Sequence, residues 1–584
     1  MRVSTCACGL GRSPSVRRVV ATFRTSHSDS ANAITCASGQ HGALEAPYEP
    51  WRKPGPGDER VPHHRPSGHL TGKTEYLARA TRDAVTLRGR RVAIASLTNT
   101  AAAEIRARTG IADRSMVAVG TLHKLCMEAL GIGGDALVAN HLDEWNDGPG
   151  RGSWQLTGKD DAEEGRANAT QGDRYLGRIE DARHRMQPLP LNTGLAQFHD
   201  AYTAWKNEHG YHDFTDCIWQ AVQETSAPSV GGHIPDTLVL DECQDSTRLE
   251  LHLVREVWGK SVERVILAGD PDQTIYEFRS AEPRVFLDYE PEHAKTLGQS
   301  YRCPRAVHAY AQSLIRRNRD RADTDWAPRD EDGELIRSSV HARDPEGILA
   351  LAERYLCDGT VMVIGSTRYA VQGVVSAARA AGVPFGNPWA PKRAEWSPLA
   401  PARRGATSSR DRLLAFLAPG RDEWSRDELL KWIPALRAKG LLAHGALTGV
   451  ETRLSDPWTS AELVALFASE DHALAAYQRD PAWLAANAKP ASQRLLSYLA
   501  AVHRRYGVDG LTDRPKLCIG TIHSVKGGSS ETVILIPDVT PRMYREGASR
   551  EGMEAQVRRF YVGATRARQR LVLASASGRL RFPL

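Results

Sequence analysis

The chain has 584 residues, of which 41% are hydrophobic and 25% charged, and its net charge of +6 is only mildly basic. This length is too great for a single hydrophobic core, so several domains are expected, and no apolar run approaches the roughly 20 residues that span a bilayer. The nine cysteines are scattered without a paired CxxC spacing, which argues against a disulfide framework or a zinc site and fits a reducing, intracellular compartment.

Residues 1–70 are rich in Ser, Gly, Pro, His and Arg and have no sustained period of 2 or 3.6 residues. We therefore expect a disordered or aberrant N-terminal extension. Residues 1–28 contain five arginines and no acidic residue, a composition that resembles a mitochondrial transit peptide. A non-functional extension is favoured over that alternative, because Gly and Pro interrupt any amphipathic helix in this stretch.

From Thr71 onward, strand-like runs alternate with helical ones. Short apolar runs predict strands at 91–97, 237–240 and 264–268. This alternation is typical of an α/β domain with a mainly parallel sheet. Residues 144–192 are polar and glycine-rich and predict a loop or a small insertion, and a helical stretch follows at 195–209.

A second strand–helix alternation begins near residue 360. Residues 388–410 are rich in Pro, Arg and Ser and are interpreted as a linker. Residues 411–510 are largely helical and contain four tryptophans, which we interpret as core anchors rather than as a row that stacks on bases: Trp424, Trp432, Trp458 and Trp483. Strand-like sequence resumes at 516–519 and 532–536.

The sequence Thr71-Gly72-Lys73-Thr74 opens a predicted helix and suggests a phosphate-binding loop. In such a loop the backbone N–H groups and the helix N-terminus cradle the phosphates. Lys73 would reach the β- and γ-phosphates, and Thr74 would bind Mg²⁺. The pattern is incomplete upstream, because Leu70 stands where a glycine eases the turn and residues 61–67 do not read as a buried strand.

Two further polar sites follow predicted buried strands. Asp241 and Glu242 come directly after the strand at 237–240, where an Asp can hold Mg²⁺ through water and the adjacent Glu can act as general base on water. An acidic turn after a core strand is the alternative. After the strand at 264–268, Gln273 could sense a γ-phosphate, while Tyr276 and Phe278 could face bases or could pack in a core.

These blocks resemble, in order, the motifs of superfamily 1A DNA helicases of the UvrD/Rep/PcrA type. The phosphate loop is followed by blocks similar to those of the family at 98–106, 120–126, 213–216, 241–245, 269–279, 300–302, 521–527 and 561–567. Two departures stand out. Leu97 occupies a position where the family often has an aromatic residue, and Gly528-Ser529 replaces the usual Leu-Glu after Lys526-Gly527.

The resemblance implies a role for each matching residue. The ATP-binding residues would be Thr71, Gly72, Lys73, Thr74 and Tyr301, with Tyr301 stacking on the adenine and Thr74 and Asp241 holding Mg²⁺. The catalytic residues would be Asp241, Glu242, Gln273, Arg302 and Arg566. Single-stranded DNA would contact Thr98, Asn99, His123, Tyr276, Phe278, Thr521 and His523. Two arginines are expected because phosphoryl transfer needs positive charge on the equatorial oxygens.

The fold that the resemblance implies is α/β, with two RecA-like P-loop NTPase lobes that have mainly parallel sheets and each carry a helical insertion. The expected domains are the extension 1–70, lobe 1A at 71–122 and 236–296, insertion 1B at 123–235, lobe 2A at 297–388 and 514–584, and a reduced insertion 2B at 389–513. ATP would lie between the lobes, and its hydrolysis would open and close the cleft.

The expected function is therefore that of an ATP-dependent helicase or translocase moving 3′–5′ on single-stranded DNA. Its partners would be single-stranded DNA and junctions of single- and double-stranded DNA, with no membrane and an unknown loading protein, and it would be cytoplasmic and nucleoid-associated. The alternatives are a translocase that does not unwind duplexes, a DNA-binding protein whose ATPase is impaired by the degenerate phosphate loop, and an unrelated P-loop ATPase that does not touch DNA.

Overall fold

The computed structural model describes most of the chain. The described residues are 17–22, 72–97, 99–158, 170–189, 192–282, 284, 286, 293–319, 321, 326–389, 395–401, 406–421, 423–452, 458 and 460–584. Thr71 and Thr98 lie outside them, and the side chains of Asn99 and Phe278 are also outside the description. Within these ranges no helix is long and apolar enough to cross a membrane.

The first lobe is built on a six-stranded parallel sheet with the order β3-β2-β4-β5-β1-β6. The strands are β1 (Arg17–Thr22), β2 (Val92–Ser96), β3 (Val117–Thr121), β4 (Thr237–Asp241), β5 (Arg264–Gly269) and β6 (His293–Lys295). Every residue of β2 and β4 is buried, as expected for a parallel sheet that is covered on both faces.

Helices cover both faces of this sheet. On one face, α1 (Gly72–Arg88) and α2 (Asn99–Thr109) share a core that includes Leu77 and Ile105. On the other face, α3 (Leu122–Leu130), α7 (Phe214–Gln223) and α8 (Arg248–His252) pack against the alternate side chains of the strands. The predicted boundary of insertion 1B at 123–235 is therefore too wide, because α3 and α7 lie in the core of the lobe.

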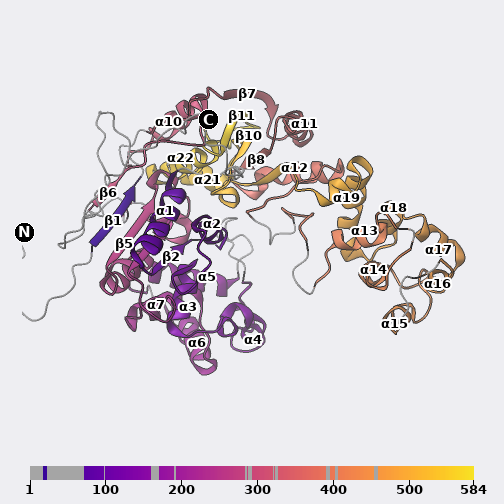
Figure 1. The fold of residues 1–584 in the computed structure, drawn as a ribbon, viewed down its shortest axis with the longest axis horizontal. Helices are drawn as coiled ribbons and strands as arrows, with labels where there is room; N and C mark the ends of the chain where they lie inside the picture. Colours follow the sequence, from indigo (N-terminus) through magenta and orange to yellow (C-terminus); the bar gives the residue numbers. More distant parts are fainter. Residues whose placement is uncertain are drawn as a thin grey trace, which may run out of the picture.

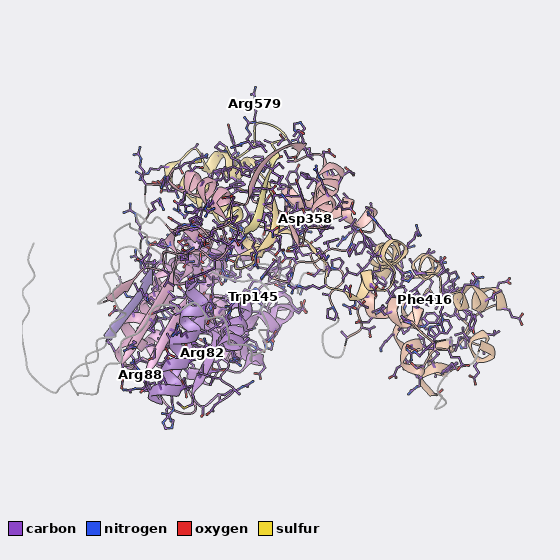
Figure 2. The ribbon with its side chains drawn as sticks, turned by 45° about the horizontal axis from the view of Figure 1, so that its top comes forward. Arg82, Arg88, Trp145, Asp358, Phe416 and Arg579 are labelled. Atoms are coloured by element: carbon purple, nitrogen blue, oxygen red, sulfur yellow. The ribbon has the colours of Figure 1, made fainter. Side chains whose placement is uncertain are left out.

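Insertion 1B contains α4 (Leu142–Asp147), α5 (Gln171–His184) and α6 (Thr193–His209) around a separate aromatic cluster that includes Trp145, Phe198 and Trp205. The composition of residues 144–192 predicts a loop or small insertion, whereas α5 forms within them. Thr170 begins this helix with a capping box to Asp173, which supplies partners for N–H groups that would otherwise be unpaired at a helix start. Trp145 is labelled within this region in Figure 2.

The second lobe has a five-stranded parallel sheet with the order β7-β11-β10-β8-β9. The strands are β7 (Glu334–His341), β8 (Val361–Gly365), β9 (Leu517–Thr521), β10 (Ser530–Ile536) and β11 (Ala567–Ser575). The helices around it are α10 (Arg305–Ile315), α11 (Pro345–Tyr355), α12 (Arg368–Ala380), α21 (Pro541–Glu546) and α22 (Arg550–Ala564). The two parallel sheets agree with the predicted α/β class.

Insertion 2B is helical and extends away from both sheets (Figure 1). Its helices are α13 (Ser409–Leu417), α14 (Arg426–Trp432), α15 (Ala446–Thr452), α16 (Ser460–Val464), α17 (Glu470–Tyr477), α18 (Pro481–Asn487), α19 (Pro490–Tyr506) and α20 (Asp509–Thr512). Trp424, Trp432 and Trp458 are buried, and Trp483 packs against the same core. The interpretation of these tryptophans as core anchors is confirmed.

Strand β1 is the largest difference from the sequence-based domain plan. Residues 1–70 were expected to lie outside the folded lobes, but Arg17–Thr22 pairs with β5 on one side and with β6 on the other. Without β1, a parallel sheet of this order would leave β5 and β6 with unpaired backbone groups. The strand between β5 and β6 therefore comes from the distant N-terminal segment.

Candidate functional site

Lys73 lies in the first turn of α1 and projects toward the carboxyl end of β4. Its ammonium group forms an ion pair with Glu242 and lies 3.8 Å from Asp241 Oδ1. Burial alone would lower the pKa of Lys73, but the two carboxylates outweigh it and raise the pKa above its ordinary value. The lysine is therefore a fixed positive charge at the helix N-terminus, where phosphate groups bind readily.

Glu242 follows β4 in a left-handed backbone conformation, with φ 56° and ψ 35°. A non-glycine residue adopts this conformation at a cost, and such residues cluster at functional sites. Burial would raise the pKa of Glu242, but Lys73 and Lys526 lower it to about 2. Gln244 Nε2 also donates a hydrogen bond of 2.6 Å to Glu242 Oε2. The carboxylate is therefore ionised and oriented at neutral pH, as a general base must be.

Asp241 is the residue that best fits a cation. Burial raises its pKa to about 6 despite the nearby Lys73, and its Oδ1 atom is buried without a hydrogen bond from any described residue. Thr74, next to Lys73 in the chain, is buried as well. These oxygen donors suit a hard cation such as Mg²⁺. Across the described ranges no cluster of three or more His, Cys, Asp or Glu side chains could hold a metal ion.

Tyr301 borders the start of α1 from the second lobe. A Cβ atom added to Gly72 would lie 3.5 Å from the Tyr301 ring, and 57% of the tyrosine surface is exposed. The Gly72 backbone and the Tyr301 ring therefore lie next to each other. This placement brings together two of the predicted ATP-binding residues, and the exposed ring has a face on which a base can stack.

The predicted arginines lie side by side in the second lobe. Arg302 Nη1 donates to the Thr565 carbonyl at 3.2 Å, and Arg566 Nη2 donates to Thr565 Oγ1 at 3.1 Å. Arg566 is 1% exposed, and burial together with Arg302 lowers its pKa to about 9. Two buried guanidinium groups repel each other, and a bound anion would offset that repulsion. The attraction between the arginines and an anion is strongest where water is excluded.

Gln273 connects these arginines to the first lobe. It lies at the end of the short helix Pro271–Gln273 after β5, and its Oε1 atom accepts a hydrogen bond of 3.0 Å from Arg566 Nη2. Its amide nitrogen donates to Asp270. Burial and the neighbouring Asp272 raise the pKa of Asp270 to about 6. Lys73, Glu242, Gln273 and Arg566 thus form one continuous polar site between the lobes.

Two residues of this site were not assigned a role from the sequence. Lys526 forms an ion pair with Asp245 and donates to the Gln273 carbonyl at 2.8 Å. Burial raises the pKa of Asp245 to about 6. Asp245 and Lys526 belong to the family-like motif blocks at 241–245 and 521–527. Their place in these blocks could have identified them as candidate site residues. Their pairing joins the loops after β4 and β9 across the lobes, and no sequence spacing reveals it.

A cavity of about 750 Å³ lies between lobe 1A and insertion 1B. His123, Phe214, Tyr276 and Arg279 line it together with polar residues of α5. Phe214 is 50% exposed and contacts His123 edge-to-face at 5.5 Å. Burial and the nearby Arg279 lower the pKa of His123 to about 4, so this ring is neutral at neutral pH. Aromatic faces beside an arginine are the features with which proteins bind single-stranded nucleic acid.

Thr521 and His523 have a different setting from the exposed one expected of DNA contacts. They are 4% and 6% exposed. Thr521 Oγ1 accepts a hydrogen bond from the Ser524 N–H at 3.1 Å, and His523 Nε2 lies 3.0 Å from the Ile275 carbonyl. The His523 ring is 5.9 Å from that of Tyr276. The structure therefore places His523 at the junction of the lobes, in contact with Tyr276 of the cavity wall, while Thr521 is buried at the end of β9.

Family models match both lobes of the chain. A model described as the UvrD/REP helicase N-terminal domain matches residues 67–294, and one described as the UvrD-like helicase C-terminal domain matches residues 494–578. Together they cover more than half of the chain. The first match contains Lys73, Glu242 and Gln273, and the second contains Lys526 and Arg566, so the two models meet at the polar site between the lobes.

Curated relatives match shorter stretches. The chain is 28% identical over 177 residues to ATP-dependent DNA helicase UvrD1 of Mycobacterium tuberculosis, which is 28% of this chain and 23% of that protein. It is 27% identical over 311 residues to the UvrD1 of Mycobacterium leprae, 46% of this chain and 39% of that protein. It is 26% identical over 105 residues to a probable DNA helicase II homolog of Mycoplasma capricolum, 17% of this chain and 14% of that protein.

Each alignment spans less than half of the relative's own length. The family assignment depends instead on the two domain models, on two parallel sheets with the predicted motifs at their carboxyl ends, and on the site that those motifs form together. On this evidence the chain belongs to the UvrD/Rep family of superfamily 1 helicases.

Proposed function

We propose that this protein is an ATP-driven motor that moves along single-stranded DNA. The observation that carries the proposal is the convergence of Lys73 and Glu242 from the first lobe with Gln273 and Arg566 at the junction with the second. A nucleotide that needs groups from both lobes will draw the lobes together when it binds and release them after hydrolysis. ATP-dependent action on DNA is also what the names of the two mycobacterial relatives state.

The residues divide the chemistry between them. Lys73 would neutralise the β- and γ-phosphates, and Tyr301 would stack on the adenine. Glu242, ionised by its cationic neighbours, would accept the proton of the attacking water. Arg302 and Arg566 would stabilise the charge that develops on the transferred phosphoryl group. Mg²⁺, held by Asp241 and Thr74, would supply further positive charge to the phosphates.

The DNA strand would lie in the cavity between lobe 1A and insertion 1B. Stacking of bases on Phe214 and Tyr276 tolerates any base, which suits a motor that must pass over every sequence. Movement in the 3′–5′ direction, activity at junctions of single- and double-stranded DNA, and action on the nucleoid are the finer parts of the proposal. They follow from the family resemblance and not from the geometry.

ATP turnover by the purified chain, measured with and without single-stranded DNA, tests the proposal. We expect turnover that single-stranded DNA stimulates and duplex DNA does not. Displacement of streptavidin from a biotinylated 5′ end but not a 3′ end would support 3′–5′ movement. Displacement of an annealed strand in the same conditions would separate a helicase from a translocase that does not unwind.

A second candidate function is DNA binding with impaired ATP hydrolysis. It is favoured by the sequence before Gly72, where Leu70 replaces a glycine and residues 61–67 contain two prolines and two histidines. The intact set of Glu242, Gln273 and Arg566 opposes it. Single-stranded DNA binding at an ordinary affinity, with no ATP turnover above that of a Lys73→Ala variant, would favour this second candidate.

A further inference from the structure

The segment that leads from the second lobe into insertion 2B is anchored to the loop after β9. Asn387 is fully buried, and its Nδ2 atom donates a hydrogen bond of 3.0 Å to Ser524 Oγ. The Trp389 N–H in turn donates to Asn387 Oδ1 at 3.1 Å. A Cβ atom at Gly520 would lie 2.5 Å from Asn387 Nδ2, so the amide fits closely against β9. Asn387 therefore fixes the position at which the chain presents Trp389.

The ring of Trp389 lies directly on Gly528. A Cβ atom added to Gly528 would approach Trp389 Cζ2 to 2.4 Å, which is closer than two carbon atoms can come without one of them moving. Gly527 has a left-handed φ of 84°, whereas the φ of Gly528 is not positive. The backbone conformation of Gly528 therefore does not require a glycine. The indole ring of Trp389 is the reason that residue 528 has no side chain. This contact accounts for the glycine, though not for Ser529, in the pair that departs from the family sequence.

The loop beneath the ring holds Arg566 from two sides. The Gly528 carbonyl accepts a hydrogen bond of 3.4 Å from Arg566 Nη1, and the Ser530 N–H donates to the Arg566 carbonyl at 3.1 Å. Immediately upstream, Lys526 donates to the Gln273 carbonyl at 2.8 Å. The guanidinium group also donates to the Val562 carbonyl at 2.8 Å and to Gln273 Oε1 at 3.0 Å. A shift of Gly528 would therefore remove the one acceptor that Arg566 Nη1 has among the described residues and loosen the group that faces Gln273.

We propose that Trp389 is a positioning residue for Arg566. Its ring holds Gly528 in place, and the Gly528 carbonyl is one of the acceptors that hold the guanidinium group facing Gln273. The inference builds on the proposed ATPase function, because it assigns a role within that site. Trp389 packs against the core of the second lobe, so its ring and Arg566 belong to the same rigid part of the molecule.

The test compares ATP turnover of single and double variants of the full chain. Trp389→Ala should lower kcat by about tenfold to a hundredfold, the effect of displacing a catalytic group by up to about 1 Å, and leave KM for ATP within about twofold because Lys73 is untouched. Trp389→Phe, which keeps a flat ring, should restore most of kcat. Gly528→Ala should lower kcat because its methyl group displaces the ring.

The double variant Trp389→Ala/Gly528→Ala is the sharpest measurement. Removing the indole ring leaves room for the new methyl group, so the double variant should turn over no more slowly than Trp389→Ala alone. Gly449→Ala is the matched glycine control, because nothing lies within 4 Å of a Cβ atom at that position. Trp483→Ala is the matched tryptophan control, because it removes a ring from the 2B core and should lower the melting temperature without changing kcat.

Multiplicative effects of the two substitutions on kcat, or an effect of Trp389→Ala confined to KM, would overturn the inference. Failure of the proposed function would look different, since the unmodified chain would then show no turnover that DNA stimulates. That outcome would overturn the positioning role as well. Whether Trp389 and Gly528 are in contact would still follow from the melting temperatures of the unmodified chain, the two single variants and the double variant.

Discussion

Glu242 differs from the acidic residues around it in the direction of its pKa shift. Burial raises the pKa of Asp241, Asp245 and Asp270 to about 6, whereas Lys73 and Lys526 hold that of Glu242 at about 2. A pair of carboxylates in different environments commonly has different roles in one reaction. The adjacent Asp241 and Glu242 have such environments, with one oxygen of Asp241 unsatisfied and Glu242 ionised beside two cations.

The first prediction concerns Glu242→Gln. The amide keeps the shape and a hydrogen-bonding group toward Lys73 but cannot accept a proton from water. ATP turnover should fall by about 10²–10⁴-fold, the contribution of general base catalysis, while nucleotide binding measured by fluorescence titration is retained. Glu353→Gln on α11, far from the site in the second lobe, is the control. Turnover within threefold of the unmodified chain would refute the role of Glu242.

The second prediction concerns Arg566→Ala. A buried guanidinium group beside Gln273 should stabilise transition-state charge more than it stabilises bound ATP. We expect kcat to fall by about 10³-fold or more, with a much smaller rise in KM for ATP, both obtained from steady-state kinetics. A change confined to KM would instead indicate that Arg566 only anchors the nucleotide.

The third prediction concerns the DNA cavity. Phe214 is half exposed, so Phe214→Ala removes a stacking surface without opening the core. Binding of a labelled oligonucleotide should weaken by about 1–3 kcal/mol, and the melting temperature should stay unchanged. Tyr276→Ala should weaken binding similarly. Because Tyr276 also lies beneath the Lys526 ammonium group at 5.1 Å, it should in addition reduce the stimulation of ATP turnover by DNA.

A loss of thermal stability with unchanged DNA affinity in these two variants would contradict the assignment of the cavity. That outcome would mean that the aromatic rings serve packing, the alternative that the sequence left open for Tyr276.

At the level of elements, β1 is the unusual part of the fold. It joins the sheet between β5 and β6, although residues 23–71 separate it from α1 and its phosphate-binding start. Strand β5 leads directly to Gln273 at its carboxyl end, so the strand that flanks β5 also steadies part of the nucleotide site.

The fourth prediction compares two truncations of the N-terminal segment. Removal of residues 1–22 deletes β1 and exposes the unpaired edges of β5 and β6. The melting temperature should fall by about 5 °C, the shift that about 2 kcal/mol gives in a lobe of this size, and the affinity for ATP should fall with it. Removal of residues 1–16 leaves β1 in place and is the control. Equal melting temperatures for the two truncated proteins would show that β1 contributes nothing to the sheet.

For the whole molecule, ion pairs connect the two lobes around the nucleotide site. Arg558 of α22 contacts Glu277 at 2.8 Å, and Arg321 contacts Asp272 at 2.8 Å, in addition to the Lys526–Asp245 pair. Glu277 and Asp272 belong to the first lobe, and the cations belong to the second. These contacts favour the closed arrangement of the lobes, which a motor must leave and regain in each cycle.

The fifth prediction concerns Glu277→Gln. Loss of the carboxylate weakens the contact with Arg558, so the nucleotide-free protein should open and its radius of gyration in X-ray scattering should increase. Addition of a non-hydrolysable ATP analogue with Mg²⁺ should restore the smaller value, because the nucleotide then joins the lobes. Asp332→Asn, which removes an exposed pair with Arg305 inside the second lobe, is the control. Identical scattering curves for the variant and the unmodified chain would contradict a holding role for this pair.

The sequence by itself determined the α/β class, the family and the approximate order of the lobes. These features depend on local patterns: apolar runs of strand length, and polar motifs directly after them such as Asp241-Glu242 and Gln273. Because parallel strands place their carboxyl ends at one edge of a sheet, the order of motifs was enough to predict that Lys73, Glu242 and Gln273 meet. The aromatic core of insertion 2B also followed from composition alone.

Only the tertiary structure decided the contacts between residues that are far apart in the chain. The placement of β1 beside β5 depends on backbone pairing with a strand more than two hundred residues away, and its sequence has no feature that reveals this partner. The Lys526–Asp245 pair, the burial of Thr521 and His523, and the Trp389 ring on Gly528 likewise depend on how the lobes pack. Local sequence determines which residues begin and end a helix or strand, but side-chain burial and charge pairing depend on the neighbours that the whole fold supplies.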